Sequence, residues 1–105
     1  VLTGRAEELQ RMTRAIHRTL QWFAKTQTLE IASLLKDYFP DLPTPLFAAC
    51  LDRYRALGLW GPDPVIRRGG FDRLHAAMRA AGALSRDIAF EACVDTAMAE
   101  KVVRE

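Results

Sequence analysis

The chain has 105 residues, of which 50% are hydrophobic and 27% charged, and this balance is typical of one globular domain. Its 15 basic and 13 acidic residues give a formal net charge of +2 and are interspersed along the sequence, so charge alone indicates neither a nucleic-acid nor a membrane partner. We therefore predict a single domain over residues 1–105 that binds no nucleic acid.

The start of the chain indicates that it is a segment of something longer. It opens at Val1 without an initiating methionine, and the first five residues do not resemble a secretory signal. Nowhere does an uninterrupted apolar run approach the roughly 18 to 20 residues that a membrane-spanning helix requires. We expect a piece of a larger protein.

The first predicted element is a long amphipathic helix over residues 4–25. Apolar residues recur at steps of three and four, the spacing that lines one helix face. This face consists of Ala6, Leu9, Met12, Ile16, Leu20 and Phe23. The opposite face is charged, and Glu7 and Arg11 are spaced for pairing on the helix surface. His17 lies beside the charged face, where we expect a solvated or rim histidine.

Two further helices are predicted before residue 58. Apolar residues from Leu29 to Tyr38 form a shorter helix that must stop before Pro40. Thr44 and Pro45 then supply a cap and a proline at the first helical position. The expected buried stripe of this third helix is Phe47, Leu51, Tyr54 and Leu57, with Asp52, Arg53 and Arg55 facing outward.

The stretch from Leu57 to Ile66 is a rigid turn. Gly58 can take the left-handed conformation that closes a helix, and Pro62 and Pro64 prevent a new one from starting. Trp60 stands between apolar neighbours inside this turn. We predict that its indole is a buried peg between helices, and the alternative is a tryptophan that stacks on a ligand.

The last third of the chain predicts a fourth helix and one or two short ones. Arg67 to Gly70 leads into an apolar stripe, with the glycine pair in the turn, and Gly82 ends the helix. The stripe consists of Phe71, Leu74, Ala77, Met78 and Ala81. Asp95 and Thr96 would cap a closing helix over residues 97–104. The fold class is therefore all-α, an array of four longer helices plus one or two short C-terminal helices.

No residue type in this pattern points to catalysis. Cys50 and Cys93 lack the spacing of a zinc site and are predicted to be small buried hydrophobes, with a disulfide as the alternative. His17 and His75 lie on predicted helix faces with no nucleophile motif around them. We predict no enzyme, no cofactor and no metal, and we assign no catalytic or ligand-binding residue.

Five segments resemble a known family. They are Gln21–Ala24, Lys36–Leu42, Leu51–Ile66, Gly70–Leu74 and Ala81–Gly82. In order and spacing they are similar to the C-terminal end of substrate-binding proteins of the nitrate/sulfonate/taurine type of ABC importer, a family that includes receptors for thiamine precursors. The most specific parts are Tyr38-Phe39-Pro40 and Leu57-Gly58-Leu59-Trp60 with Asp63-Pro64.

The resemblance implies the closing helices of a two-lobed α/β receptor. Such a receptor is periplasmic or a cell-surface lipoprotein, binds a small organic or inorganic anion or a related solute, and delivers it to an ABC permease. The solute would contact lobes outside this chain. Without those lobes, helix faces evolved to cover a sheet would be bare, so we expect the isolated segment to be a homo-oligomer. The alternative is a free-standing helical protein–protein interaction module.

Overall fold

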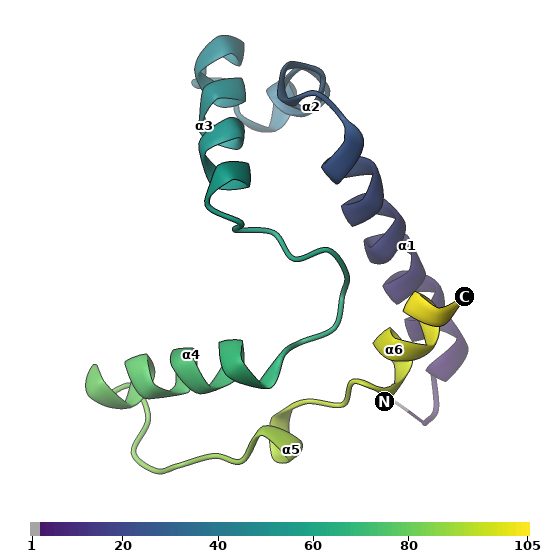
Figure 1. The fold of residues 1–105 in the computed structure, drawn as a ribbon, viewed down its shortest axis with the longest axis vertical. Helices are drawn as coiled ribbons and strands as arrows, with labels where there is room; N and C mark the ends of the chain where they lie inside the picture. The colour runs from purple at the N-terminus through teal and green to yellow at the C-terminus, as the bar shows by residue number, and fades with distance from the viewer. Residues whose placement is uncertain (1–2) are drawn as a thin grey trace. The chain divides into compact units, whose positions relative to one another are not determined.

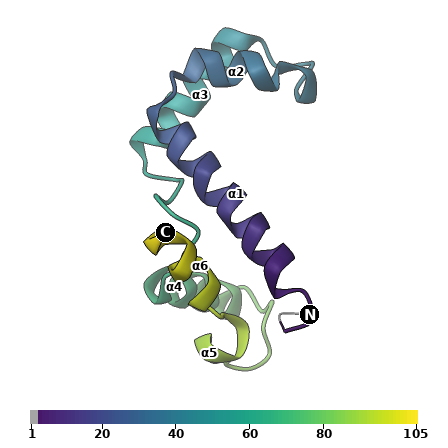
Figure 2. The ribbon, with the colours of Figure 1, turned by 90° about the vertical axis from the view of Figure 1, so that its right-hand side faces the viewer.

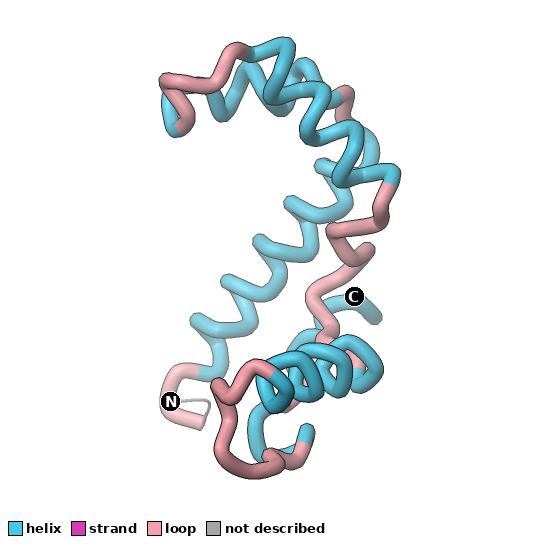
Figure 3. Tube along the Cα trace, turned by 90° about the vertical axis from the view of Figure 1, so that its left-hand side faces the viewer, coloured by secondary structure: helices cyan, strands magenta, loops and turns pink. Residues whose placement is uncertain are grey.

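The computed structural model describes residues 3–105, and all regular structure in that range is helical, as the absence of strand colour in Figure 3 shows. The elements are α1 (Ala6–Lys25), α2 (Thr28–Leu35), the 3₁₀ helix η1 (Lys36–Tyr38), α3 (Thr44–Ala56), α4 (Arg68–Ala80), α5 (Phe90–Cys93) and α6 (Ala97–Arg104). The predicted all-α class, with four longer helices followed by short ones, is confirmed. Within residues 3–105, no helix combines the length and apolar character needed to cross a membrane.

The chain divides into two compact units. Residues 14–63 form one, which we call the central unit, and the described residues up to Thr13 together with residues 64–105 form the other, the terminal unit. Helix α1 contributes residues to both. The prediction of a single domain over residues 1–105 stays a prediction.

The core of the central unit lies between α2 and α3, which pack against each other; Figure 1 shows α2 nearly end-on beside α3. Its buried residues are Ile31, Ala32, Phe47, Ala48 and Leu51, against which Phe23 and Leu42 pack. Phe47 and Leu51 thus confirm half of the predicted stripe of α3. Tyr54 and Leu57, the other half, are exposed because α2 begins at Thr28, beside Asp52, and does not extend along the last turn of α3.

A polar contact joins the same two helices beside this core. The hydroxyl of Thr28, at the buried start of α2, donates a hydrogen bond of 2.8 Å to the Asp52 carboxylate on α3. A buried hydroxyl without a partner would destabilise the folded state, so this bond lets α2 begin inside the core.

In the terminal unit, α6 runs along the first turns of α1, as Figure 2 shows. The Gln10 amide bonds Glu105 at 3.1 Å and Lys101 at 3.4 Å, and Val102 is buried. In the same unit α4 packs on α5. There Phe71 meets Phe90 edge to face, with ring centres 5.3 Å apart.

Arginine strengthens the α4–α5 contact. The Arg68 guanidinium lies 4.6 Å from the centre of the Phe90 ring and pairs with the Glu91 carboxylate. Because both partners of the ion pair are largely exposed, the pair orients α5 more than it stabilises the fold.

The helix ends combine confirmed and corrected predictions. Gly58 and Gly82 both have positive φ, 67° and 74°, and end α3 and α4 as predicted. Gly69 and Gly70 do not form the turn before α4, because the helix already begins at Arg68. Thr44 is not a cap either, since it is the first residue of α3 and makes no side-chain capping bond.

The apolar face of α1 is left largely uncovered, as expected from the sequence. No residue of α1 is buried, and Met12 and Ile16 are 55% and 45% exposed. Of this face only Phe23 packs against the core of the central unit. The helices that follow α1 are shorter than its 20 residues and do not cover its length.

We predict that Ile31→Ala destabilises the central unit by about 2–5 kcal/mol, because it leaves a cavity at a position with 0% exposure. Both tryptophans, Trp22 and Trp60, lie in this unit, so urea unfolding followed by tryptophan fluorescence reports on it. Leu34→Ala on the same helix is the matched control. Its side chain is 61% exposed, so its loss should stay within about 0.5 kcal/mol.

Candidate functional site

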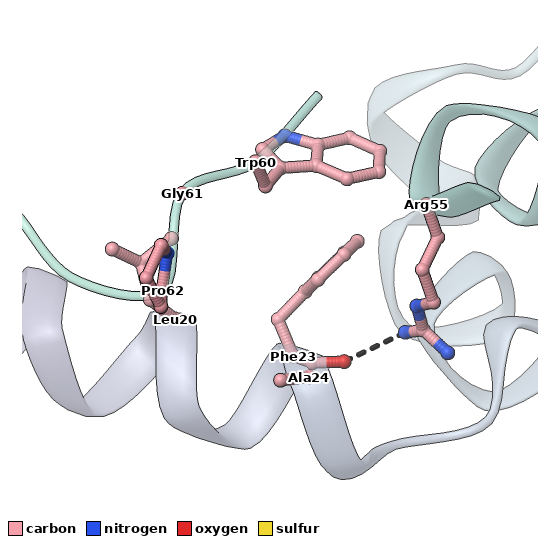
Figure 4. A pocket seen from close by; sticks show the side chains of 7 residues that line it. All are labelled: Leu20, Phe23, Ala24, Arg55, Trp60, Gly61 and Pro62. Carbon is pink, nitrogen blue, oxygen red and sulfur yellow. Dashed lines mark hydrogen bonds between the residues drawn. The ribbon is translucent and has the colours of Figure 1, made fainter. Parts of the chain in front are cut away.

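A cavity of about 240 Å³ lies in the central unit where α1 and α3 end beside the turn after α3 (Figure 4). We call it the Trp60 cavity. It is lined by Leu20, Phe23 and Ala24 of α1, Arg55 of α3, and Trp60, Gly61 and Pro62 of the turn.

The end of α3 positions Trp60. The amide of Gly58 donates to the carbonyl of Arg55 and that of Leu59 to the carbonyl of Tyr54, both at 3.0 Å. This pair of bonds around a left-handed glycine is a Schellman motif, which reverses the chain and satisfies the last carbonyls of the helix. The reversal brings the next residue, Trp60, back over the end of α1.

Trp60 packs between two aromatic rings. Its ring centre lies 4.5 Å from that of Phe23, tilted by 59°, and 6.0 Å from that of Tyr54, edge to face. Such pairs contribute about 0.5–1.5 kcal/mol beyond the area they bury. The side chain is nevertheless 36% exposed, so the predicted fully buried peg is wrong. The turn leaves one side of the indole open.

Arg55 closes the cavity from α3 and caps α1. Its Nη2 donates to the carbonyls of Phe23, at 2.6 Å, and Thr26, at 2.9 Å, and its guanidinium carbon lies 5.1 Å from the centre of the Phe23 ring. These carbonyls belong to the C-terminal end of α1, where the helix dipole favours a cation. The prediction that Arg55 faces outward is therefore wrong, because the carbonyls at the end of α1 offer it two acceptors.

The lining of the Trp60 cavity is suited to binding and contains no group that exchanges protons near neutral pH. Its walls are aromatic and aliphatic, and Arg55 brings a positive charge to one side. A guanidinium stays protonated at any working pH, and none of the seven lining residues is a carboxylate, a histidine, a hydroxyl or a thiol. The cavity can thus hold an apolar or aromatic group but cannot transfer a proton.

A second cavity, of about 190 Å³, lies in the terminal unit. It is lined by Phe71, Leu74, His75, Met78, Leu84, Ile88 and Cys93. His75 is the one polar ring in an otherwise apolar wall. Its Nε2 accepts a hydrogen bond of 3.0 Å from the Ile88 amide, and its ring lies 6.0 Å from that of Phe71, nearly parallel.

The structure tests the remaining sequence predictions for cysteine and histidine. Both cysteines are free thiols; Cys50 is partly buried, and the prediction of burial is wrong for Cys93, which is exposed because α5 is a single turn. His17 is partly buried with its Nδ1 shielded from solvent, which fits a position at the rim of the charged face. Among residues 3–105 there is no cluster of three or more potential metal ligands.

The sequence pointed to Trp60 but to none of its partners in the cavity. The contact of Phe23 and Arg55 joins residues 32 positions apart, which no helical period encodes. One sequence signal could have indicated the role of Arg55. Arg53 and Arg55 lie in the last turn of α3, close to a chain reversal, and helix ends leave backbone carbonyls that an arginine can bind.

The chain is similar to a curated protein of Bacillus subtilis (strain 168) named "Putative binding protein YtlA". The two are 27% identical over 95 residues, which cover 90% of this chain and 28% of the other. The chain thus spans less than a third of the relative's length. No family model matches the chain, and no solved structure matches it.

These comparisons overturn the family predicted from the sequence. Because no family model matches, the assignment to substrate-binding proteins of the nitrate/sulfonate/taurine type is wrong as a family identification. What the comparisons support is coarser. The name of the relative states binding and names neither a solute nor a transport system.

We predict that Trp60→Ala destabilises the central unit by about 1–3 kcal/mol, less than the 3–5 kcal/mol typical of a fully buried aromatic, because the indole keeps two ring contacts but is partly exposed. Urea unfolding followed by circular dichroism measures the loss. Trp22→Ala is the control, since that ring is outside the Trp60 cavity. Equal losses for the two variants would contradict a special role for Trp60.

Arg55→Met should cost about 2–4 kcal/mol. The substitution keeps most of the apolar stem and removes two charge-assisted hydrogen bonds to the end of α1. Arg53→Met, on the exposed side of the same helix, is the matched control and should change stability by less than about 0.5 kcal/mol. If both variants unfold at the same urea concentration, the capping role of Arg55 is refuted.

Proposed function

We propose that this chain is the helical part of a larger binding protein whose ligand is a small solute. The observation that carries the proposal is the similarity over 95 residues to a protein named as a binding protein, of which the chain spans 28%. The Trp60 cavity supports it, since it combines apolar walls with a cation and no proton-transfer group. Binding sites for small molecules are concave, mostly apolar and fixed by few polar groups.

The proposal includes the nature of the solute and its fate. The charge of Arg55 supports a small organic or inorganic anion as the ligand. A receptor that delivers its solute to an ABC permease binds the solute and does not convert it. We propose that role for the complete protein. It would be located in the periplasm or on the cell surface as a lipoprotein. It would not be an enzyme, and the lobes outside this chain would supply further contacts to the solute.

Intrinsic fluorescence can test solute binding. In a Trp22→Phe variant, Trp60 is the only tryptophan, so its emission reports on the Trp60 cavity alone. We expect saturable quenching or a spectral shift with at least one compound of a panel of small organic and inorganic anions, and loss of the effect in Arg55→Met. The reciprocal Trp60→Phe variant, which keeps Trp22, should show no saturable change.

A panel without any saturable response, repeated on the longest polypeptide that contains this chain, would refute the proposal. A response in both single-tryptophan variants would place the solute elsewhere than the Trp60 cavity. That result would support the binding function but refute the Trp60 cavity as the binding site.

One observation favours a different class, a helical protein–protein interaction module. Met12 and Ile16, one turn apart on α1, are exposed, and α2 adds exposed Leu29 and Leu34. Apolar helix faces of this kind are common at interfaces between identical chains.

We expect sedimentation at micromolar concentration to detect a homodimer. Ile16→Glu should shift the equilibrium towards monomer, whereas Arg18→Glu, on the charged side of α1, should not; a monomer at all concentrations would contradict the homo-oligomer expected of the isolated segment.

A further inference from the structure

The hydrogen bond between His75 and Ile88 fixes the protonation of the imidazole. A backbone amide can only donate, so Nε2 of His75, 3.0 Å from the Ile88 nitrogen, must act as the acceptor. A ring nitrogen that accepts carries no proton. In this structure His75 is therefore neutral, with its proton on Nδ1.

A second acceptor stands close to the same nitrogen. The Asp87 carboxylate lies 4.0 Å from Nε2 of His75 and 3.3 Å from Nε of Arg79. Arg79 also donates to the carbonyl of Leu84, at 3.0 Å. The segment from Leu84 to Ile88 is thus attached to α4 at two places, through Arg79 and through His75.

Other charged and titratable groups near His75 are accounted for. On its own helix Asp72 lies one turn before it. From α5, Glu91 pairs with Arg68, and the Cys93 thiol lines the same cavity as His75. Asp87 is thus the carboxylate nearest to Nε2.

Protonation reverses the role of Nε2. A charged imidazole has a hydrogen on both nitrogens, so Nε2 and the Ile88 amide would become two donors facing each other. The nearest acceptor for the new N–H is Asp87, which gains an ion pair in exchange. Asp87 lies only 4.0 Å from Nε2, so a small ring movement brings the new N–H within hydrogen-bonding distance of the carboxylate.

We propose that His75 is a proton-operated latch on the cavity of the terminal unit. While neutral, it holds the Ile88 amide, and with it the Leu84 and Ile88 side chains, in the cavity wall. On protonation it releases the amide, pairs with Asp87 and lets the wall opposite Phe71 and Met78 open. This regulatory device does not depend on the proposed solute-binding function.

Nuclear magnetic resonance on the full chain tests the latch directly. At pH 8 the ¹⁵N shifts of His75 should show the proton on Nδ1. Between pH 8 and pH 5, the range in which histidine side chains change charge, hydrogen-exchange protection of the Ile88 amide should fall about three- to tenfold after correction for the intrinsic rate. The Ala83 and Val94 amides, bonded to the carbonyls of Met78 and Phe90, should keep their protection.

Three variants separate the latch from a general effect of acid. His75→Gln offers a neutral acceptor at every pH and should abolish the fall at Ile88. Asp87→Asn removes the destination of the protonated ring and should reduce the fall. His17→Gln, which changes the other histidine of the chain, should leave it unchanged.

The opening of the cavity has its own readout. Nuclear Overhauser contacts between the Ile88 and Met78 methyl groups should weaken in step with the exchange of Ile88. A proton on Nε2 at pH 8, a constant protection of Ile88, or an equal fall in His75→Gln would each overturn the proposal. The first two measurements use the unmodified protein, so they decide the matter even if a variant fails to fold.

Discussion

The contact of Arg55 with the end of α1 is the interaction on which the central unit depends. Helix α1 ends without intrahelical partners for its last carbonyls, and α3 approaches that end with a planar cation whose Nη2 binds two of them. The same guanidinium lies against Phe23, which in turn packs on Trp60 and on the α2–α3 core. One side chain thereby ties a helix end, an aromatic cluster and a core together.

This tie matters because the core is small. Five buried side chains hold α2 against α3. A short chain buries a smaller part of its surface than a large domain does, so single polar contacts carry a larger part of its stability. The hydrogen bonds of Thr28 with Asp52 and of Arg55 with the end of α1 are of this kind. The first gives the buried Thr28 hydroxyl an acceptor, and the second gives backbone carbonyls at the helix end a donor. The exposed apolar face of α1 is the other consequence of the small core.

The sequence predicted local structure well because local structure follows local rules. Helical periodicity and the two closing glycines placed α1, α3 and α4 within a few residues of their observed bounds, since a left-handed residue at Gly58 or Gly82 satisfies carbonyls of its own helix. Periodicity identifies which face is apolar but not whether a neighbour is long enough to cover it. That is why Tyr54 was expected to be buried and is not.

The candidate sites were less predictable, because each joins residues that are distant in sequence through a polar atom. In the helical pattern of α3, Arg55 falls among the polar residues that were expected to face solvent. It points inward only because the end of α1 lies beside it and offers a carbonyl acceptor. His75 follows Leu74 on an amphipathic helix, and nothing in that pattern announces an acceptor for an amide 13 residues later. Such contacts depend on the tertiary path of the chain, which single-sequence patterns do not contain.

The hydrogen bond of His75 also bears on the choice between binding and catalysis. The cavity of the terminal unit brings a histidine and a thiol, His75 and Cys93, into one lining, which is the combination that nucleophilic catalysis uses. A general base needs a free ring nitrogen with a lone pair. In the neutral ring Nε2 already accepts from Ile88 and Nδ1 carries the proton, so His75 has no lone pair left for a thiol proton. In the protonated ring it has none at all. In neither state can His75 therefore act as a general base towards Cys93.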